Sequence, residues 1–312
     1  MAAILEAEQL TKHYGEAVAV DGVDLVVEEG EIFGLLGPNG AGKTTTISML
    51  TGVLEPTSGS ARIGGLDIGK DAQAVKRMSG LVPQDLALYP TLSARANLQF
   101  FGRIYGLRGR ELDERVDDVL QVVALADRAG DAIETFSGGM KRRINIAAGL
   151  VHQPQLLFLD EPTVGVDPQS RNHIFESVQQ LNRDRGMSIV YTSHYMEEVE
   201  LLCDRVAIVD QGKVIADDTI KNLVAMLGGG VIELGLESPD EQTLSDIGAL
   251  PAVKEVSLIS AAGPTAPSDA AEEPPAEATG ASAGPMLKIT CARSQDALVQ
   301  VFGYLNERDM SF

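Results

Sequence analysis

The segment from Gly37 to Thr44 reads Gly-Pro-Asn-Gly-Ala-Gly-Lys-Thr, which fits the P-loop pattern for phosphate binding. Glycines let such a loop curl until its N–H groups point at phosphates, and the following helix adds partial positive charge. Lys43 is expected to reach the β and γ phosphates, and the Thr44 hydroxyl to bind Mg²⁺. A chance Gly-rich turn is the alternative, disfavoured by the strand before the loop and the helix after it. The predicted nucleotide-binding residues are Gly37, Asn39, Gly40, Ala41, Gly42, Lys43, Thr44 and Thr45.

Two acidic residues follow an apolar run further along the chain. Leu156–Leu159 is continuously apolar, and Asp160 and Glu161 come directly after it. Because α/β sheets bind ligands at the carboxyl ends of their strands, acids placed here can reach a bound phosphate. Asp160 suits the Mg²⁺ shell, and Glu161 suits a base that polarises an attacking water. Alone, two such acids are more often a solvated strand end, but the phosphate loop favours the catalytic interpretation.

The elements that would hold these residues alternate between strands and helices, which predicts an α/β core with a largely parallel sheet. Ile32–Leu36 is typical of a buried strand, and the helix after the loop is expected at Thr44–Leu54. From Thr91 to about Leu150 the pattern is mostly helical, which predicts a helical subdomain over about residues 85–150. The other expected elements are half-exposed strands within Ile4–Val27, buried strands at Leu156–Leu159 and Ile189–Thr192, a helix near Arg171–Asn182, and a hairpin at Arg205–Val214.

A second, smaller domain is expected after the glycines at 228–230. Residues 1–230 would form the first domain, and residues 231–312 a small α/β extension. Residues 261–285 are almost entirely Ala, Pro, Gly, Ser, Thr, Glu and Asp, a composition that predicts a disordered loop inside that extension. Its expected strands and helix are Val231–Leu236, Val253–Ile259, Met286–Thr290 and Ser294–Leu305.

The overall composition excludes several classes of protein. The 25 Lys and Arg residues face 45 Asp and Glu residues, a formal charge of −20 that disfavours nucleic acid as a partner. No window of about 18 uncharged apolar residues occurs, so any membrane role must come from another chain. Cys203 and Cys291 stand far apart and are predicted to be reduced thiols in a cytosol.

The segment Phe136–Arg143, shortly before Asp160 and Glu161, resembles the signature motif of the ABC ATPase family. The resemblance implies that Ser137, Gly138 and Gly139 contact the γ phosphate of ATP bound to a second copy of the chain, so that two copies enclose two nucleotides. Phe136 departs from the usual leucine, but both side chains are apolar. In isolation, a Ser-Gly-Gly helix cap would be the more common explanation.

Four further residues match family motifs in the expected order. The resemblance implies that Tyr14 stacks on adenine, that Gln84 touches Mg²⁺ and senses a membrane partner, and that Asp167 acts across the dimer interface. It also implies that His194 contacts the γ phosphate. Each residue alone has a plainer explanation: Tyr14 as packing, Gln84 as a loop residue, Asp167 in a simple turn, and His194 as a structural strand-end histidine.

The resemblance covers about residues 1–225 and predicts a P-loop NTPase core of ABC type with antiparallel β and helical subdomains. Met140–Arg143 and Ser193–Glu198 look like ATPase subunits of ABC-2 type exporters, including those for daunorubicin and linearmycin resistance. The implied function is ATP hydrolysis, with Mg²⁺, as a homodimer bound to an ABC-2 type permease at the cytoplasmic face of the membrane. Alternatives are a soluble ATPase of iron–sulfur cluster assembly, a DNA repair or translation factor, and a regulatory subunit that does not hydrolyse ATP.

Overall fold

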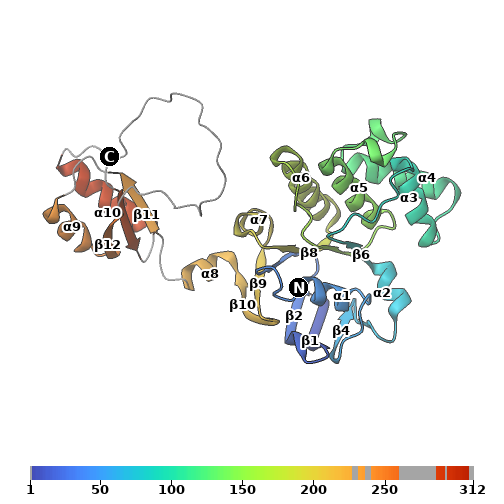
Figure 1. Ribbon diagram of the computed structural model, residues 1–312, viewed down its shortest axis with the longest axis horizontal. Helices are drawn as coiled ribbons and strands as arrows, with labels where there is room; N and C mark the ends of the chain where they lie inside the picture. The colour runs from blue at the N-terminus through green and yellow to red at the C-terminus, as the bar shows by residue number, and fades with distance from the viewer. Residues whose placement is uncertain (1, 227–230, 236–239, 260–285, 292–293, 309–312) are drawn as a thin grey trace, which may run out of the picture. The chain divides into compact units, whose positions relative to one another are not determined.

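The computed structural model describes residues 2–226, 231–235, 240–259, 286–291 and 294–308. The chain forms two compact units, residues 1–220 and residues 221–312, whose elements are labelled in Figure 1. The boundary expected after residue 230 and the disordered loop expected at 261–285 both involve residues outside the described ranges, so both stay predictions.

A six-stranded sheet lies at the centre of the first unit. Its order is β10-β9-β3-β8-β7-β6, and every neighbouring pair is parallel except β9 and β10. The expected parallel sheet is therefore confirmed, together with the hairpin that joins its last two strands. The strands are β3 (Ile32–Leu36), β6 (Ser79–Val82), β7 (Leu156–Leu159), β8 (Ser188–Ser193), β9 (Arg205–Asp210) and β10 (Lys213–Thr219).

The apolar runs of this sheet supply two separate hydrophobic clusters. In β7, Leu157 and Leu159 pack into a cluster with the helical layer, whereas Leu156 and Phe158 pack into a cluster with the second sheet. Side chains of a strand alternate between its two faces, so a strand covered on both faces must be apolar at every position. This requirement explains why β7 contains no polar residue.

A second, antiparallel sheet covers one face of the core in the order β2-β1-β4-β5. Only its first part was expected from the sequence, as strands within Ile4–Val27. The sheet and its neighbouring helices comprise β1 (Ala3–Tyr14), β2 (Ala17–Glu28), β4 (Ser58–Ile63), β5 (Leu66–Asp67), α1 (Lys43–Leu50) and α2 (Ala72–Met78).

Helix α1 is shorter than the sequence predicted. It was expected to reach Leu54 but ends at Leu50, because the N–H groups of Val53 and Leu54 both donate to the carbonyl of Ser48 and turn the chain away. The Thr51 hydroxyl donates to the carbonyl of Ile47 at 2.8 Å and satisfies one of the last acceptors of the helix.

Helices α3 to α6 form the layer drawn at the upper right in Figure 1. The helical segment expected near residues 85–150 is present as α3, α4, two short 3₁₀ turns and α5. Helix α6 ends at Arg185 and is capped by Gly186, whose φ of 61° is the left-handed conformation that glycine adopts readily. The helices are α3 (Ala94–Ile104), α4 (Gly109–Val122), α5 (Gly138–Leu150), α6 (Pro168–Arg185) and α7 (Met196–Leu202).

The second unit contains a three-stranded antiparallel sheet in the order β11-β13-β12. Its small core contains Leu287, Ile289 and Leu305. The strands match the expected ones closely, but helix α9 was not predicted. The elements from α8 onward are α8 (Ile220–Met226), β11 (Val231–Gly235), α9 (Glu241–Gly248), β12 (Val253–Ile259), β13 (Met286–Cys291) and α10 (Ser294–Glu307).

Within the described ranges, no helix combines the length and the apolar character that crossing a bilayer would require.

One half-buried histidine connects the helical layer to the sheet. The ring of His152 stacks on Tyr105 with 3.6 Å between centroids, and its Nε2 lies 3.0 Å from the carbonyl oxygen of Ser79. Its Nδ1 is buried and has no hydrogen-bond partner among the described residues. Burial lowers the pKa of His152 below the ordinary value of 6.5, so the folded chain favours the neutral ring.

We expect His152→Phe to weaken the dependence of stability on acid pH. A histidine held neutral in the folded state takes up a proton on unfolding once the pH falls below about 6.5, so its contribution to stability is present above that pH and is lost below it. The melting temperature of the variant should therefore fall less than that of the parent between pH 7.5 and pH 5.5 by calorimetry. The more exposed His173, changed to Gln, is the control, and equal slopes for parent and His152→Phe would contradict the expectation.

Candidate active site

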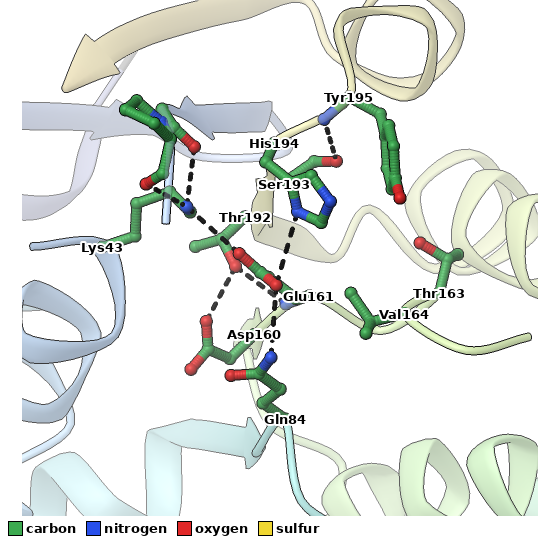
Figure 2. A network of polar contacts seen from close by, with 12 residues as sticks. Lys43, Gln84, Asp160, Glu161, Thr163, Val164, Thr192, Ser193, His194 and Tyr195 are labelled. Carbon is green, nitrogen blue, oxygen red and sulfur yellow. Dashed lines mark hydrogen bonds and ion pairs between the residues drawn. The ribbon is translucent and has the colours of Figure 1, made fainter. Parts of the chain in front are cut away.

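Four neighbouring strands end at the same edge of the central sheet, and each is followed by a segment that the sequence predicted to be functional. The register pairs Leu36 with Ser193, Tyr191 with Leu159, and Leu159 with Val82, so the ends of β3, β8, β7 and β6 lie side by side. Parallel strands direct their carboxyl ends to one edge, where α/β proteins bind ligands. The side chains that follow these strands converge in Figure 2.

The phosphate loop after β3 requires glycine at two positions because of close backbone contacts. A Cβ on Gly37 would lie 2.2 Å from the carbonyl oxygen of Val209, and one on Gly42 would lie 2.6 Å from that of Ala19. Gly42 also has a φ of 104°, which side-chain-bearing residues rarely adopt. The N–H of Gly37 donates to the carbonyl of Ser193 at 3.3 Å and ties the loop to the end of β8.

Lys43, the first residue of α1, is buried at 5% exposure with its ammonium among oxygen atoms. Its Nζ donates to the carbonyl oxygens of Gly37 at 2.7 Å and Pro38 at 3.0 Å, and it lies 3.1 Å from Oε1 of Glu161. A buried cation needs such partners, and they fix its direction toward the loop. The ammonium is therefore held where a phosphate cradled by the loop would meet it.

Glu161 stands at the centre of the convergence in Figure 2. Its Oε2 accepts a hydrogen bond from Gln84 Nε2 at 3.3 Å and lies 3.5 Å from Nδ1 of His194, without the geometry of a hydrogen bond to the ring. The backbone of Glu161 has a φ of 45°, a left-handed conformation that costs energy for a residue with a side chain. Such strain clusters at functional sites, where surrounding contacts hold it in place.

Asp160 points to the other side of the same strand end. It is buried, and its Oδ1 accepts a hydrogen bond from the Thr192 hydroxyl at 2.8 Å. Burial raises the pKa of Asp160, while hydrogen bonds from Thr192 and Thr44 act in the opposite direction. A carboxylate beside a threonine hydroxyl is an oxygen-donor pair of the kind that Mg²⁺ prefers, so the residues present fit that ion.

A polar cavity of about 280 Å³ opens beside these groups. Loop residues, Lys43, Gln84 and Glu161 meet on its walls, so a phosphate-bearing ligand placed there would contact N–H groups, an ammonium and a carboxylate at once. Tyr14, the predicted adenine contact, is 53% exposed near the β1–β2 turn and does not line the cavity. The lining residues are Ala19, Asn39, Gly40, Gly42, Lys43, Thr44, Thr45, Gln84 and Glu161.

The remaining predicted residues form a second group, at the starts of two helices. Ser137 caps α5 by accepting a hydrogen bond from Met140 N at 3.2 Å, and Asp167 caps α6 by accepting one from Ser170 N at 2.9 Å. Gly139 allows the two helices to approach, because a Cβ there would lie 2.1 Å from the Ser170 hydroxyl. None of these residues, nor Gly138, lines the cavity beside Lys43.

Capping leaves the predicted anion-binding role of Ser137 intact. Its hydroxyl oxygen accepts the hydrogen bond from Met140, so its O–H remains able to donate. Ser137 and Gly138 are both exposed at the N-terminus of a thirteen-residue helix, where N–H groups and the helix dipole favour anions. The capping role is therefore observed and is compatible with the anion-binding role, which stays a prediction.

Two residues that organise the site were not predicted from the sequence. The Thr192 hydroxyl contacts Asp160 and also accepts a hydrogen bond from the Glu161 N–H at 2.8 Å. Arg142, buried in α5, donates to the carbonyls of Pro83 and Gln84. A polar residue at the end of an apolar strand was a usable signal for Thr192. Nothing local marks Arg142, because its partners lie about sixty positions away.

A phosphate loop after β3, a carboxylate pair after β7 and the α/β sheet that contains both strands together define a P-loop nucleotide-binding domain. A family model described as ABC transporter matches residues 20–164. The linearmycin resistance ATP-binding protein LnrL of Bacillus subtilis is 53% identical over 256 residues, covering 82% of each chain. The daunorubicin resistance ATP-binding protein DrrA2 of Streptomyces coeruleorubidus is 42% identical over 74% of this chain and 71% of its own.

A solved structure agrees with these relatives. An ATP-binding cassette determined as a dimer in a post-hydrolysis state with ADP and Pi superimposes with a TM-score of 0.63 at 25% identity. The match covers 69% of this chain and 98% of that one. This chain belongs to the family of ABC transporter ATP-binding proteins, and it is an ATPase that binds nucleotide through its P-loop domain.

Proposed function

We propose that this chain hydrolyses ATP to power the export of a drug, antibiotic or lipid-like molecule through a separate ABC-2 type permease. The observation that carries the proposal is the buried contact between Lys43 and Glu161, beside a cavity lined by residues that follow β3, β6 and β7. The resistance proteins that match most of this chain support the export role. No described feature favours iron–sulfur cluster assembly, the alternative expected from the sequence.

The groups around the cavity divide the chemistry of ATP hydrolysis between them. The loop N–H groups and Lys43 bind the β and γ phosphates, and Glu161 accepts a proton from the attacking water. His194 and Gln84 both contact Glu161 and orient it toward that water. Thr44, Asp160 and Gln84 would hold Mg²⁺, which when bound neutralises charge on the phosphates. Tyr14 would stack on the adenine ring.

A second copy of the chain completes the site. Ser137, Gly138 and Gly139 of that copy would reach the γ phosphate bound by Lys43 of the first, and Asp167 would act across the interface. The dimeric cassette with ADP and Pi supports this arrangement. Within one chain, the N-terminus of α5 does not line the cavity. A dimer explains this separation, because each copy would supply only some of the groups that contact one bound nucleotide.

The permease contact is proposed on exposed apolar side chains that follow Gln84 in the chain. Tyr89 and Phe100 pack edge to face with centroids 4.9 Å apart and remain 46% and 37% exposed, and Ile104 is 63% exposed. Exposed aromatic and aliphatic groups gathered on one helix and its preceding loop are typical of an interaction surface. The chain would therefore sit peripherally at the cytoplasmic face of the membrane.

Purification from detergent-solubilised membranes of the native host, followed by mass spectrometry, tests the export role. We expect a polytopic membrane protein in about equal amount with the parent chain. Ile104→Asp should lose that protein, whereas Val53→Asp, an equally drastic change at an exposed residue that precedes this surface in the chain, should keep it. Recovery of only soluble cluster-assembly or nucleic-acid proteins would overturn the export role but leave the ATPase.

Asp160→Asn should impair the use of Mg²⁺. We expect the Mg²⁺ concentration for half-maximal ATP hydrolysis to rise about tenfold, since a ligand carboxylate loses its charge while keeping its shape. A titration with MgCl₂ at saturating ATP measures this midpoint. Asp127→Asn, at an exposed aspartate in a 3₁₀ turn, is the matched control. An unchanged midpoint would remove Asp160 from the proposed metal site.

A further inference from the structure

Glu198, in helix α7, is a buried carboxylate that the proposed chemistry does not use. It is 3% exposed, and three hydroxyl groups donate to it. The Thr163 hydroxyl binds Oε1 at 2.7 Å, and the hydroxyls of Tyr191 and Ser193 bind Oε2 at 3.0 Å and 2.8 Å. Burying a carboxylate is costly unless hydrogen bonds replace water, so these donors fix its position closely.

Two of the donors belong to segments that carry proposed active-site residues. Thr163 follows Glu161 by two positions, and Ser193 directly precedes His194, as Figure 2 shows. The Ser193 hydroxyl also accepts a hydrogen bond from Tyr195 N at 3.0 Å, so it fixes the backbone on both sides of His194. Glu198 thus joins the segment after the proposed base to the segment around the histidine.

A third segment reaches the same carboxylate. Arg171, in the first turns of α6 shortly after Asp167, places Nε 3.7 Å from Oε1 of Glu198. Its guanidinium carbon lies 5.8 Å from the centre of the Tyr195 ring. The start of α6, where the proposed dimer-interface residue lies, is therefore in contact with the same buried charge.

We propose that Glu198 is a positioning residue that fixes the position of the His194 side chain relative to that of Glu161. The inference rests on the proposed roles of those two residues. Nδ1 of His194 lies 3.5 Å from Oε2 of Glu161, and no hydrogen bond between them sets that separation. The distance is instead set by the segments that carry the two side chains. The Thr192 hydroxyl joins these segments through the Glu161 N–H, and Glu198 is a second group that both segments contact.

Glu198→Gln tests the inference, because it keeps the shape but replaces one acceptor oxygen by an amide that cannot accept from hydroxyls. We expect kcat for ATP hydrolysis to fall about 10- to 100-fold, as misplacement by about 1 Å does, while KM for ATP changes less than about threefold. Glu197→Gln, at the exposed neighbour on the same helix, should behave as the parent. Unchanged kcat in Glu198→Gln would overturn the proposal.

A double-mutant cycle with His194→Ala separates positioning from simple loss of structure. A variant that only lowered the folded fraction would reduce the rate by the same factor whether or not the histidine is present. If Glu198 acts through His194, Glu198→Gln should reduce the rate of hydrolysis only slightly in the His194→Ala background. Single-turnover release of labelled phosphate measures all four rates. Equal factors in both backgrounds would refute the proposal, whereas full activity of His194→Ala alone would refute the role of the histidine.

Two further variants cover the case in which Glu198→Gln does not fold. Thr163→Val and Ser193→Ala each remove one hydroxyl that donates to Glu198 and keep the carboxylate in place. We expect each to lower kcat by about three- to tenfold, with the effect of Ser193→Ala vanishing in the His194→Ala background. Normal rates for both single variants would overturn the inference.

Discussion

Glu161→Gln is expected to reduce ATP hydrolysis by at least about 100-fold, because the amide cannot accept the proton of the attacking water. ATP binding should persist, since the loop and Lys43 are untouched. The substitution also removes the negative charge that lies 3.1 Å from the Lys43 ammonium. The ammonium then interacts with the phosphates without competition from that carboxylate. The variant should therefore accumulate as an ATP-bound dimer. Phosphate release and size-exclusion chromatography with light scattering measure the two effects.

Glu200→Gln serves as the control for this variant, because it makes the same change at an exposed position of α7. Hydrolysis at the parental rate in Glu161→Gln would show that another group activates the water. A slow variant that stays monomeric with ATP would keep Glu161 as the base but count against the trapped dimer.

Ser137→Arg is expected to abolish the ATP-driven dimer. The arginine would project from the exposed N-terminus of α5 into the space where the γ phosphate of the other copy is proposed to lie. We expect steady-state hydrolysis to fall about 100-fold, because the loss of one preorganised hydrogen-bond donor to the reacting group typically lowers the rate of an enzyme by about that factor. Binding of ATP to the monomer should be retained, because Ser137 does not line the cavity beside Lys43.

The Glu161→Gln background makes this test decisive, because its dimer should be long-lived. Glu161→Gln alone should elute as a dimer with Mg²⁺ and ATP, and the double variant with Ser137→Arg as a monomer. Thr135→Arg places the same side chain at an exposed residue two positions earlier and should leave the dimer intact. A dimer that survives Ser137→Arg would remove the α5 N-terminus from the interface.

The sequence predicted those parts of the site that short motifs specify. The strand before the phosphate loop, the acids after β7 and the histidine after β8 each lie within a few residues of the pattern that marks them. Their strand ends must meet at one edge because parallel strands of one sheet point the same way. The convergence of Lys43, Glu161 and His194 therefore follows from local signals and one rule of topology.

The parts that could not be predicted depend on contacts between distant segments. Strand β4 reads Ser-Gly-Ser-Ala-Arg-Ile, which has little strand preference, and its pairing with β1, Ile63 opposite Leu5, holds it in the sheet. The partners of Arg142 and Glu198 likewise lie up to about sixty positions away. Local pattern carries no information about such pairs, so only the folded chain reveals the groups that contact the segments around the proposed catalytic residues.

The burial of the central strands also determines which parts of the first unit unfold first. Because β3, β7 and β8 are covered on both faces, their amides are shielded from solvent until both hydrophobic clusters separate. Native-state hydrogen exchange should therefore find the amides of Phe33, Phe158 and Val190 among the slowest, exchanging only through global unfolding, while the helical layer opens at lower free energy. The sheet edge that carries the phosphate loop would then remain aligned through fluctuations that release the surrounding helices, and loss of that edge would coincide with unfolding of the first unit.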